Sequence, residues 1–262
     1  MKAVLTGSTG TVGSALSKHL SEQGAEVIGW DRSRMRPGDQ QAAEKFLREA
    51  KPDVLFHLAV ASQPAGIADE YHIVGTVWPE QLAELTRRLD IRFVFTSSVM
   101  VFSDDAKGPF TPETSPDAAM GYGAEKRRAE ELIRHANADA IIARLGWQIG
   151  GNDVTDRNDM ASFLERQWKA EGVIRASSKW FPACSFLSDT AAALTQLASM
   201  PGSSYLLDAN RQWSFYDICV ALRTARDATW HIEATEDFIY DQRMIDLRIE
   251  LPSLKVRLPD LH

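Results

Sequence analysis

The chain of 262 residues has few cysteines, no excess of positive charge and no long apolar run. Its two cysteines, Cys184 and Cys219, lack the spacing of metal ligands, so we expect no metal site and two free thiols in a reducing cytoplasm. The net charge of −7 argues against a nucleic-acid or anionic-membrane binder. No apolar run approaches membrane-spanning length, and the first predicted strand, which begins at Lys2, leaves no room for a signal peptide.

The opening of the chain has the pattern of a strand, a tight loop and a helix. An apolar run at residues 3–5 leads into Gly7, Gly10 and Gly13. Glycines also close ordinary strand-to-helix turns, but here they allow the backbone to approach a ligand, and the start of the helix favours a phosphate. Asp31 follows a second apolar run eighteen residues beyond Gly13, where a dinucleotide fold places the acid that holds the adenosine ribose. The stretch predicts a dinucleotide-binding unit.

Strands and helices continue to alternate as far as residue 145. Helices are expected over 41–50, 78–89 and 121–136, and strands over 53–60, 91–96 and 140–145. Continuous apolar strands are typical of a parallel sheet that is covered on both faces. The predicted fold class is therefore α/β, a doubly wound parallel sheet (Rossmann fold) with its ligand at the carboxyl edge.

The pattern loosens beyond Gly146. The expected elements are short helices over 160–171, 189–199 and 215–225, and strands over 173–174 and 205–207. We expect residues 1–145 to form an NAD(P)-binding Rossmann domain. Residues 146–262 are expected to form mainly a small C-terminal substrate-binding lobe, with elements that return to the Rossmann core. Five of the seven tryptophans fall in this part, and we expect them to be core residues rather than ligand contacts.

Three polar residues at the predicted sheet edge suggest chemistry. Tyr122 and Lys126 lie four residues apart and so share one helical face. One fixed charge about 4 Å away is worth ~4 kcal/mol at an effective dielectric near 20, so Lys126 is expected to lower the pKa of Tyr122 by roughly three units. Ser98, at a strand end, could donate a second hydrogen bond to a substrate carbonyl under hydride attack. Each feature alone has a structural explanation, since such helical pairs are common and a serine often caps a turn.

Four motifs together resemble the extended short-chain dehydrogenase/reductase superfamily over nearly the whole chain. They are Thr6-Gly7-x-x-Gly10-x-x-Gly13, His57-Leu58-Ala59, Thr96-Ser97-Ser98 and Tyr122-x-x-x-Lys126. Within the superfamily, four segments are most similar to dTDP-4-dehydrorhamnose reductases and related nucleotide-sugar enzymes: Lys51–Val54, Ser97–Phe102, Tyr122–Lys126 and Arg144–Trp147. The resemblance implies an NAD(P)-dependent oxidoreductase or epimerase that acts on a keto or hydroxyl group of a sugar or nucleotide sugar.

The resemblance also implies roles for individual residues. The catalytic residues would be Ser98, Tyr122 and Lys126, with Tyr122 as acid/base. The cofactor would contact Gly7, Gly10, Thr11, Val12, Gly13, Asp31, Arg32, Asp39, Gln40, Leu58, Ala59, Val60, Tyr122 and Lys126. In this assignment the glycine loop lines the pyrophosphate, Asp31 holds the ribose, Asp39 and Gln40 border the adenine, and Lys126 contacts the nicotinamide ribose.

The chain departs from the family pattern on the fourth helix. The family often has an asparagine just before a Gly-Thr pair, and here His72 or Val74 occupies that neighbourhood of Gly75-Thr76. In the C-terminal part, Asp189 lies in a segment similar to one that leads into a helix in the family, and we interpret it as an N-cap.

The choice of cofactor depends on a balance of charges. Asp31 repels a 2′-phosphate and bonds a free hydroxyl, which favours NAD over NADP. Arg32, Arg34 and Arg36 follow and could hold a phosphate if they turned inward, although a solvated loop is their expected role.

Several functions stay open from the sequence. Val99 and Met100 follow Ser98 where sugar 4,6-dehydratases carry an acidic pair, so a dehydratase is disfavoured. Reductase, epimerase and dehydrogenase of a free sugar or sugar acid all remain, as does a cofactor-binding regulatory subunit without turnover. The resemblance further implies a homodimer paired through the helices at 78–89 and 121–136.

Overall fold

The computed structural model describes residues 1–33, 35–61, 69–150 and 159–261, and the chain divides into two compact units. Unit 1 comprises Met1–Ser103, Pro116–Arg144 and Ala191–Tyr205. Unit 2 comprises Asp104–Ser115, Leu145–Thr190 and Leu206–His262. The two units therefore interleave along the sequence rather than following one another.

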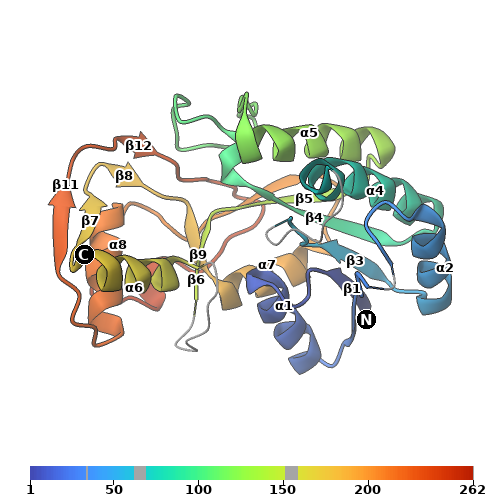
Figure 1. Ribbon diagram of the computed structural model, residues 1–262, viewed down its shortest axis with the longest axis horizontal. Helices are drawn as coiled ribbons and strands as arrows, with labels where there is room; N and C mark the ends of the chain where they lie inside the picture. Colours follow the sequence, from blue (N-terminus) through green and yellow to red (C-terminus); the bar gives the residue numbers. More distant parts are fainter. Residues whose placement is uncertain (34, 62–68, 151–158, 262) are drawn as a thin grey trace. The chain divides into compact units, whose positions relative to one another are not determined.

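Unit 1 contains nearly all of a six-stranded sheet (Figure 1). Its strands are β1 (Lys2–Thr6), β2 (Glu26–Gly29), β3 (Val54–His57), β4 (Arg92–Ser98), β5 (Ile141–Leu145) and β10 (Ser204–Leu207), in the order β10-β5-β4-β3-β1-β2. β1 pairs in parallel with β2 and β3, and β3 pairs in parallel with β4. The predicted α/β fold with a doubly wound sheet is confirmed. The order changes direction between β1 and β3, and in such sheets ligands bind beyond the carboxyl ends of the strands at that point.

Helices cover both faces of this sheet. They are α1 (Thr11–Glu22), α2 (Gln40–Ala50), α3 (Glu70–His72), α4 (Trp78–Arg88), α5 (Gly121–Ala136) and α7 (Leu187–Leu197), with a π-helical turn η1 (Ile73–Val77) and a 3-10 turn η2 (Val99–Val101). Figure 1 shows α4 and α5 on one face and α1 on the other. The sequence did not predict α3 and η1, because β-branched residues and Gly75 give this stretch a low helix propensity.

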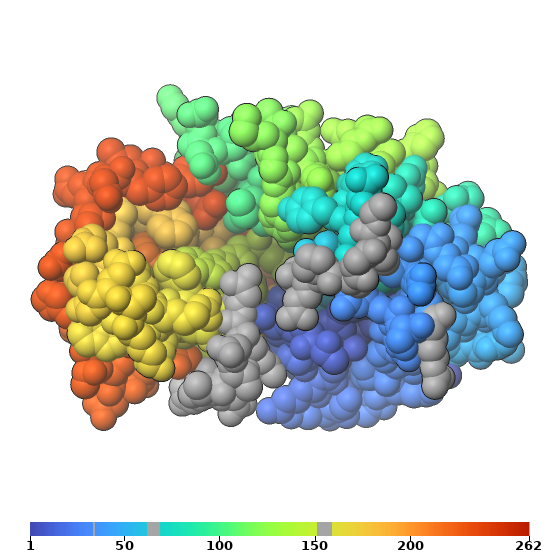
Figure 2. Space-filling model, viewed as in Figure 1, coloured from blue at the N-terminus to red at the C-terminus, as the bar shows by residue number. Residues whose placement is uncertain are grey.

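The main core of unit 1 lies between the sheet and helices α2, α4 and α5. Strand residues such as Leu55 and Phe93 face Leu47, Leu82 and Ile133 of these helices, and all five are almost fully buried. Figure 2 shows one face of the molecule, on which the described residues of this part of the chain are coloured blue to cyan. Throughout the described residues, no helix is both long and apolar enough to cross a membrane.

Unit 2 contains short strands that pair two by two. β6 (Trp147–Ile149) pairs with β9 (Cys184–Phe186), β7 (Ile174–Ser177) with β11 (Ile232–Thr235), and β8 (Trp180–Phe181) with β12 (Tyr240–Asp241). Helices α6 (Met160–Glu171) and α8 (Phe215–Ala225) and the 3-10 turn η3 (Leu254–Val256) complete the unit. α6 and α8 have the bounds that the sequence predicts, but most of these strands were missed because two to four residues are too few to show an alternating pattern.

Two buried carboxylates organise unit 2. Asp208 accepts backbone hydrogen bonds from Cys184, Asn210 and Met244 at 2.8–2.9 Å, and burial raises its pKa to about 7 despite these bonds. The prediction that Asp189 is an N-cap is wrong. α7 begins at Leu187, and Asp189 lies in the first turn of that helix, where it accepts two hydrogen bonds from Arg257.

The cysteines and tryptophans also bear on the predictions. Cys184 and Cys219 are free, as expected, and both are buried. The expectation that the C-terminal tryptophans are core residues is right only in part. Trp213 and Trp230 are buried, whereas Trp147 is half-buried and stacks on the partly exposed Trp180 with ring centroids 6.1 Å apart.

His57 ends β3 as a buried, neutral side chain. Its ring stacks on Phe95 at 5.8 Å, and its Nδ1 lies 2.9 Å from Thr6 Oγ1. That oxygen accepts the N–H groups of residues 58–59, so the hydroxyl donates its own hydrogen to Nδ1. Burial, assisted by the positive charge of Lys126, lowers the pKa of His57 to about 3.

The buried His57 makes stability depend on pH. Below pH 6.5 the unfolded chain binds a proton at this residue and the folded chain does not until about pH 3, so stability is lost as the pH falls through this range. We expect the unfolding free energy to drop by about 2 kcal/mol more between pH 7 and pH 5 in the wild type than in His57→Phe, measured by urea denaturation. His135→Phe, at an exposed site, should keep the full drop. An equal drop in His57→Phe and wild type would contradict the assignment.

Candidate functional site

The glycine loop joins β1 to α1 at the point where the sheet changes direction. Gly7 has φ +67°, and a Cβ there would lie 3.0 Å from the backbone nitrogen and Cα of Ala59. A Cβ at Gly13 would overlap the carbonyl oxygen of Gly7, to which the N–H of Gly10 donates a hydrogen bond of 3.0 Å. The loop therefore packs its backbone against the end of β3 and leaves no room for side chains at these positions.

The start of α1 is suited to an anion. Gly10 is the N-cap, and no side chain caps this helix in the described part of the chain. The N–H groups of Thr11, Val12 and Gly13 belong to the first turn, which has no partners within the helix, and the helix dipole adds a partial positive charge there. A tight glycine cradle before such a helix start fits the pyrophosphate of a dinucleotide.

Asp31 lies two residues beyond the end of β2 and is exposed. Its carboxylate accepts the N–H of Ser33 at 2.9 Å and the hydroxyl of Ser33 at 2.6 Å, which fixes its orientation. Arg32 and Arg36 are exposed, as expected of a solvated loop, and Arg34 lies outside the described residues.

Asp39 and Gln40 lie at the start of α2. Asp39 is the N-cap of this helix, and its Oδ1 accepts the N–H of Ala42 at 3.0 Å. Its observed contact is therefore structural, and the contact with adenine stays a prediction.

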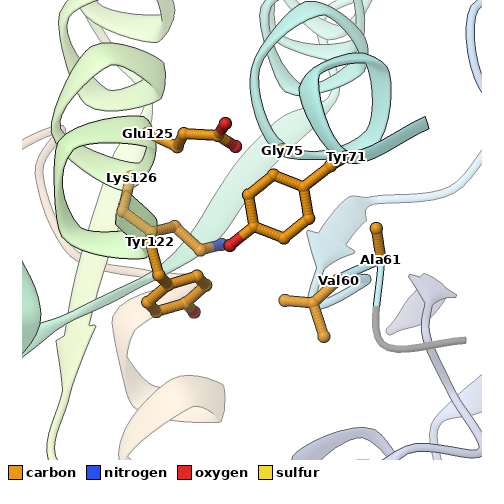
Figure 3. A pocket seen from close by; sticks show the side chains of 7 residues that line it. All are labelled: Val60, Ala61, Tyr71, Gly75, Tyr122, Glu125 and Lys126. Carbon is orange, nitrogen blue, oxygen red and sulfur yellow. The ribbon is translucent and has the colours of Figure 1, made fainter. Parts of the chain in front are cut away.

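A cavity of about 190 Å³ in unit 1 brings predicted and unpredicted residues together (Figure 3). It is lined by Val60, Ala61, Tyr71, Gly75, Tyr122, Glu125 and Lys126. Tyr71 and Gly75 come from the helical stretch that the sequence did not predict. Gly75 belongs to the Gly-Thr pair of the family pattern, which was the available signal for it, whereas no pattern pointed to Tyr71. Glu125 stands inside the Tyr-x-x-x-Lys motif, and its position next to Lys126 was the available signal.

Lys126 is buried in the cavity wall. Its Nζ donates a hydrogen bond of 2.9 Å to the carbonyl oxygen of Thr96 and lies 4.4 Å from the centroid of the Phe95 ring. Burial lowers the pKa of Lys126 to about 8, while the carboxylates of Glu130 and Glu125 oppose this shift. The bond to Thr96 fixes the ammonium at the end of β4.

The pKa of Tyr122 differs from the prediction. Burial, with a smaller contribution from Tyr71, raises the pKa of Tyr122 to about 12. The expectation that Lys126 brings the pKa of Tyr122 below its ordinary value is therefore wrong. The ammonium lies 5.8 Å from the centroid of the Tyr122 ring and bonds Thr96, so its attraction does not offset the burial of the phenol.

Ser98 ends β4 and caps the following turn. Its Oγ accepts the N–H of Met100 at 3.1 Å, which is the structural role that serines at strand ends often have. Because Oγ is the acceptor in this bond, the hydroxyl hydrogen is left to donate. Ser98 does not line the cavity that contains Tyr122 and Lys126.

The π-helical turn η1 brings Gly75 to the cavity. π-turns inside α-helices are frequent at functional sites. A Cβ at Gly75 would lie 2.9 Å from Oε2 of Glu125, so α5 and this helix are in close contact. His72 and Val74, which stand near the position of the family asparagine, are not among the residues that line the cavity.

Two further predictions concern metal and partner. Among the described residues, no group of three or more His, Cys, Asp and Glu side chains could hold a metal ion. The helices expected to pair two protomers carry exposed charges, Glu84, Arg87 and Arg88 on α4 and Arg128 and Glu131 on α5. The homodimer stays a prediction.

Known relatives match most of the chain. A family model described as the RmlD substrate binding domain matches residues 1–231. The spore coat polysaccharide biosynthesis protein SpsK of Bacillus subtilis is 25% identical over 224 residues, which cover 84% of this chain and 78% of that protein. A dTDP-4-dehydrorhamnose reductase of Mycobacterium tuberculosis is 25% identical over 206 residues, covering 75% of this chain and 66% of the relative.

Another relative is named as a subunit of an enzyme complex rather than as a reductase. Methionine adenosyltransferase 2 subunit beta of Xenopus tropicalis is 27% identical over 154 residues, covering 55% of this chain and 46% of that subunit. Among solved structures, a dTDP-4-dehydrorhamnose reductase from Bacillus anthracis in complex with NADP shares the fold with a TM-score of 0.83. It is 16% identical, and the alignment covers 99% of this chain and 98% of that one.

The packing of the glycine loop predicts unequal effects of two matched substitutions. Gly13→Ala places a methyl group on backbone that cannot move away, so we expect a loss of about 2 kcal/mol or more in unfolding free energy. Gly10→Ala, whose methyl group would lie 3.3 Å from the same oxygen, should lose about 1 kcal/mol or less. Thermal and urea unfolding of both variants measure the difference, and equal losses would show that the loop is not packed in this way.

Proposed function

Because the chain belongs to the RmlD substrate binding domain family, we propose that it is an NAD(P)-dependent oxidoreductase that acts on a keto or hydroxyl group of a nucleotide sugar. The observation that carries the proposal is the cavity that Tyr122 and Lys126 share, which follows the carboxyl end of β3 through Val60. The relative named dTDP-4-dehydrorhamnose reductase supports this substrate class. The name of this relative favours reduction over epimerisation.

The glycine loop and its neighbours support a site for the cofactor. The loop residues Gly7, Gly10 and Gly13, with Thr11 and Val12 at the start of α1, would hold the pyrophosphate. Asp31 would bond the adenosine ribose, and its negative charge favours NAD(H) over a cofactor with a 2′-phosphate. Leu58 and Ala59 lie against Gly7 and would form the adenosine side of the site. When bound, the nicotinamide supplies the hydride.

The side chains of the site would then handle the proton. The Tyr122 hydroxyl would donate its hydrogen to the substrate oxygen as negative charge develops there. The Ser98 hydroxyl would donate a second hydrogen bond to that oxygen. Lys126, held by Thr96, would stabilise the tyrosinate that remains after the transfer.

The role of Tyr122 can be tested by removing one oxygen. We expect Tyr122→Phe to reduce turnover of a keto nucleotide sugar by roughly 100-fold or more, while binding of NAD(P)H, followed by its fluorescence, is unchanged. Tyr205→Phe is the matched control, because its hydroxyl bonds the Pro201 carbonyl in unit 1, away from the cavity residues. Undiminished turnover in Tyr122→Phe with cofactor still bound would contradict the proposal.

A second candidate is a cofactor-binding regulatory subunit, which the relative named methionine adenosyltransferase 2 subunit beta supports. Retention of Ser98, Tyr122 and Lys126 favours the enzyme, because a protein without turnover does not need all three. Titration with NADH and NADPH separates the two candidates. Tight binding without oxidation by a panel of keto sugars, sugar acids and nucleotide sugars would favour the regulatory subunit.

A further inference from the structure

Lys126 carries its ammonium into surroundings that oppose a charge. The side chain is 3% exposed, and its Nζ faces the Phe95 ring on one side and the Tyr122 ring on another. The bond to the Thr96 carbonyl accounts for one of its three hydrogens. Burial of this kind favours loss of the proton, yet a neutral amine would have no positive charge with which to stabilise a tyrosinate.

Two carboxylates of α5 act on this ammonium, but one of them is already paired. Glu130 accepts two hydrogen bonds from Arg144, at 3.1 and 2.7 Å, and both side chains are buried. The positive charge of Arg144 therefore weakens the field of Glu130, which is still the larger of the two contributions that oppose loss of the Lys126 proton. Glu125 is half-buried and makes neither an ion pair nor a hydrogen bond in the described part of the chain.

The Glu125 carboxylate lies against the backbone of Gly75. The Oε2 atom lies where it would be 2.9 Å from a Cβ at Gly75, which is closer than side chains normally approach. Figure 3 shows the carboxylate of Glu125 directed toward the helix of Gly75, with Lys126 on the next position of α5. Because glycine has no side chain, residue 75 leaves room for the Glu125 carboxylate at the cavity.

The other titratable groups near Lys126 bring no negative charge. His57, on β3, is neutral because burial lowers its pKa to about 3. Burial also raises the pKa of Tyr122 on α5, and burial together with Glu125 raises the pKa of Tyr71 on α3, so both phenols are neutral near pH 7. Glu125 is left as the carboxylate whose charge no cation of the described residues offsets.

We propose that Glu125, seated against Gly75, is a positioning residue that keeps the Lys126 ammonium charged beside Tyr122. The inference rests on the proposed function, because the charge matters only if Tyr122 transfers a proton. Glu125 acts through Lys126 and needs no contact with the substrate. Its negative charge opposes the loss of a proton that burial would otherwise cause, and so preserves the electrostatic support for a tyrosinate.

The experiment measures the protonation of Lys126 directly. Protein labelled with ¹³C at the lysine ε-carbon is titrated by NMR without cofactor or substrate, and the Lys126 signal is assigned by its loss in Lys126→Arg. The wild type should give a pKa of about 8, and Glu125→Gln, which keeps the size of the side chain, should lower it to about 7. Glu131→Gln, on the exposed side of the same helix, should leave the value unchanged.

A second variant tests the same carboxylate by moving it instead of removing its charge. Gly75→Ala should displace Glu125 and lower the pKa of Lys126 in the same direction, and adding Gly75→Ala to Glu125→Gln should cause no further change. An unchanged or raised pKa of Lys126 in Glu125→Gln would overturn the inference. Equal effects of Gly75→Ala with and without Glu125 would also overturn it, because the glycine would then act independently of the carboxylate.

The outcome can be separated from that of the proposed function, since the titration needs no turnover. If the wild type has activity, the alkaline limb of its pH profile should move down by about one pH unit in Glu125→Gln, whereas a purely structural loss would lower activity at every pH. If the wild type has no activity, the proposed function fails, and the titration still decides whether Glu125 controls the charge of Lys126.

Discussion

The hydrogen bond between the Lys126 ammonium and the Thr96 carbonyl is the contact on which the candidate site depends. It fastens α5 to β4 near the carboxyl end of this strand and fixes the helical face that carries Tyr122. An ammonium placed beside the Phe95 ring must keep at least one strong acceptor, because an unpaired buried charge is expensive. The same lysine therefore carries the charge of the candidate site and packs against the sheet.

A second constraint is the close approach of backbone to backbone between β1 and β3. Gly7 touches the segment at Ala59, and Thr6 binds both that segment and His57 through its hydroxyl. These contacts join the glycine loop to the residues that continue into the cavity at Val60. The predicted cofactor site and the cavity therefore lie at one edge of the sheet of unit 1.

The charges around the cavity depend on which side chains form ion pairs and which are neutral. Arg144 matches Glu130, His57 stays neutral through burial, and Glu125 stands without a cation among the described residues. The charge of each of these side chains affects Lys126, because charges in low-dielectric surroundings interact more strongly than in water. Glu130 and Glu125 both support the Lys126 ammonium, and of the two only Glu125 has no cation partner among the described residues.

Local patterns in the sequence determined the α/β class, the glycine loop and the helical face shared by Tyr122 and Lys126, because each depends on spacing within a few residues. Only the tertiary structure decided which groups meet them. The contact of Gly75 with Glu125, the pairing of Asp189 with Arg257 and the raised pKa of Tyr122 all depend on residues distant in sequence or on burial, for which a linear pattern carries no signal.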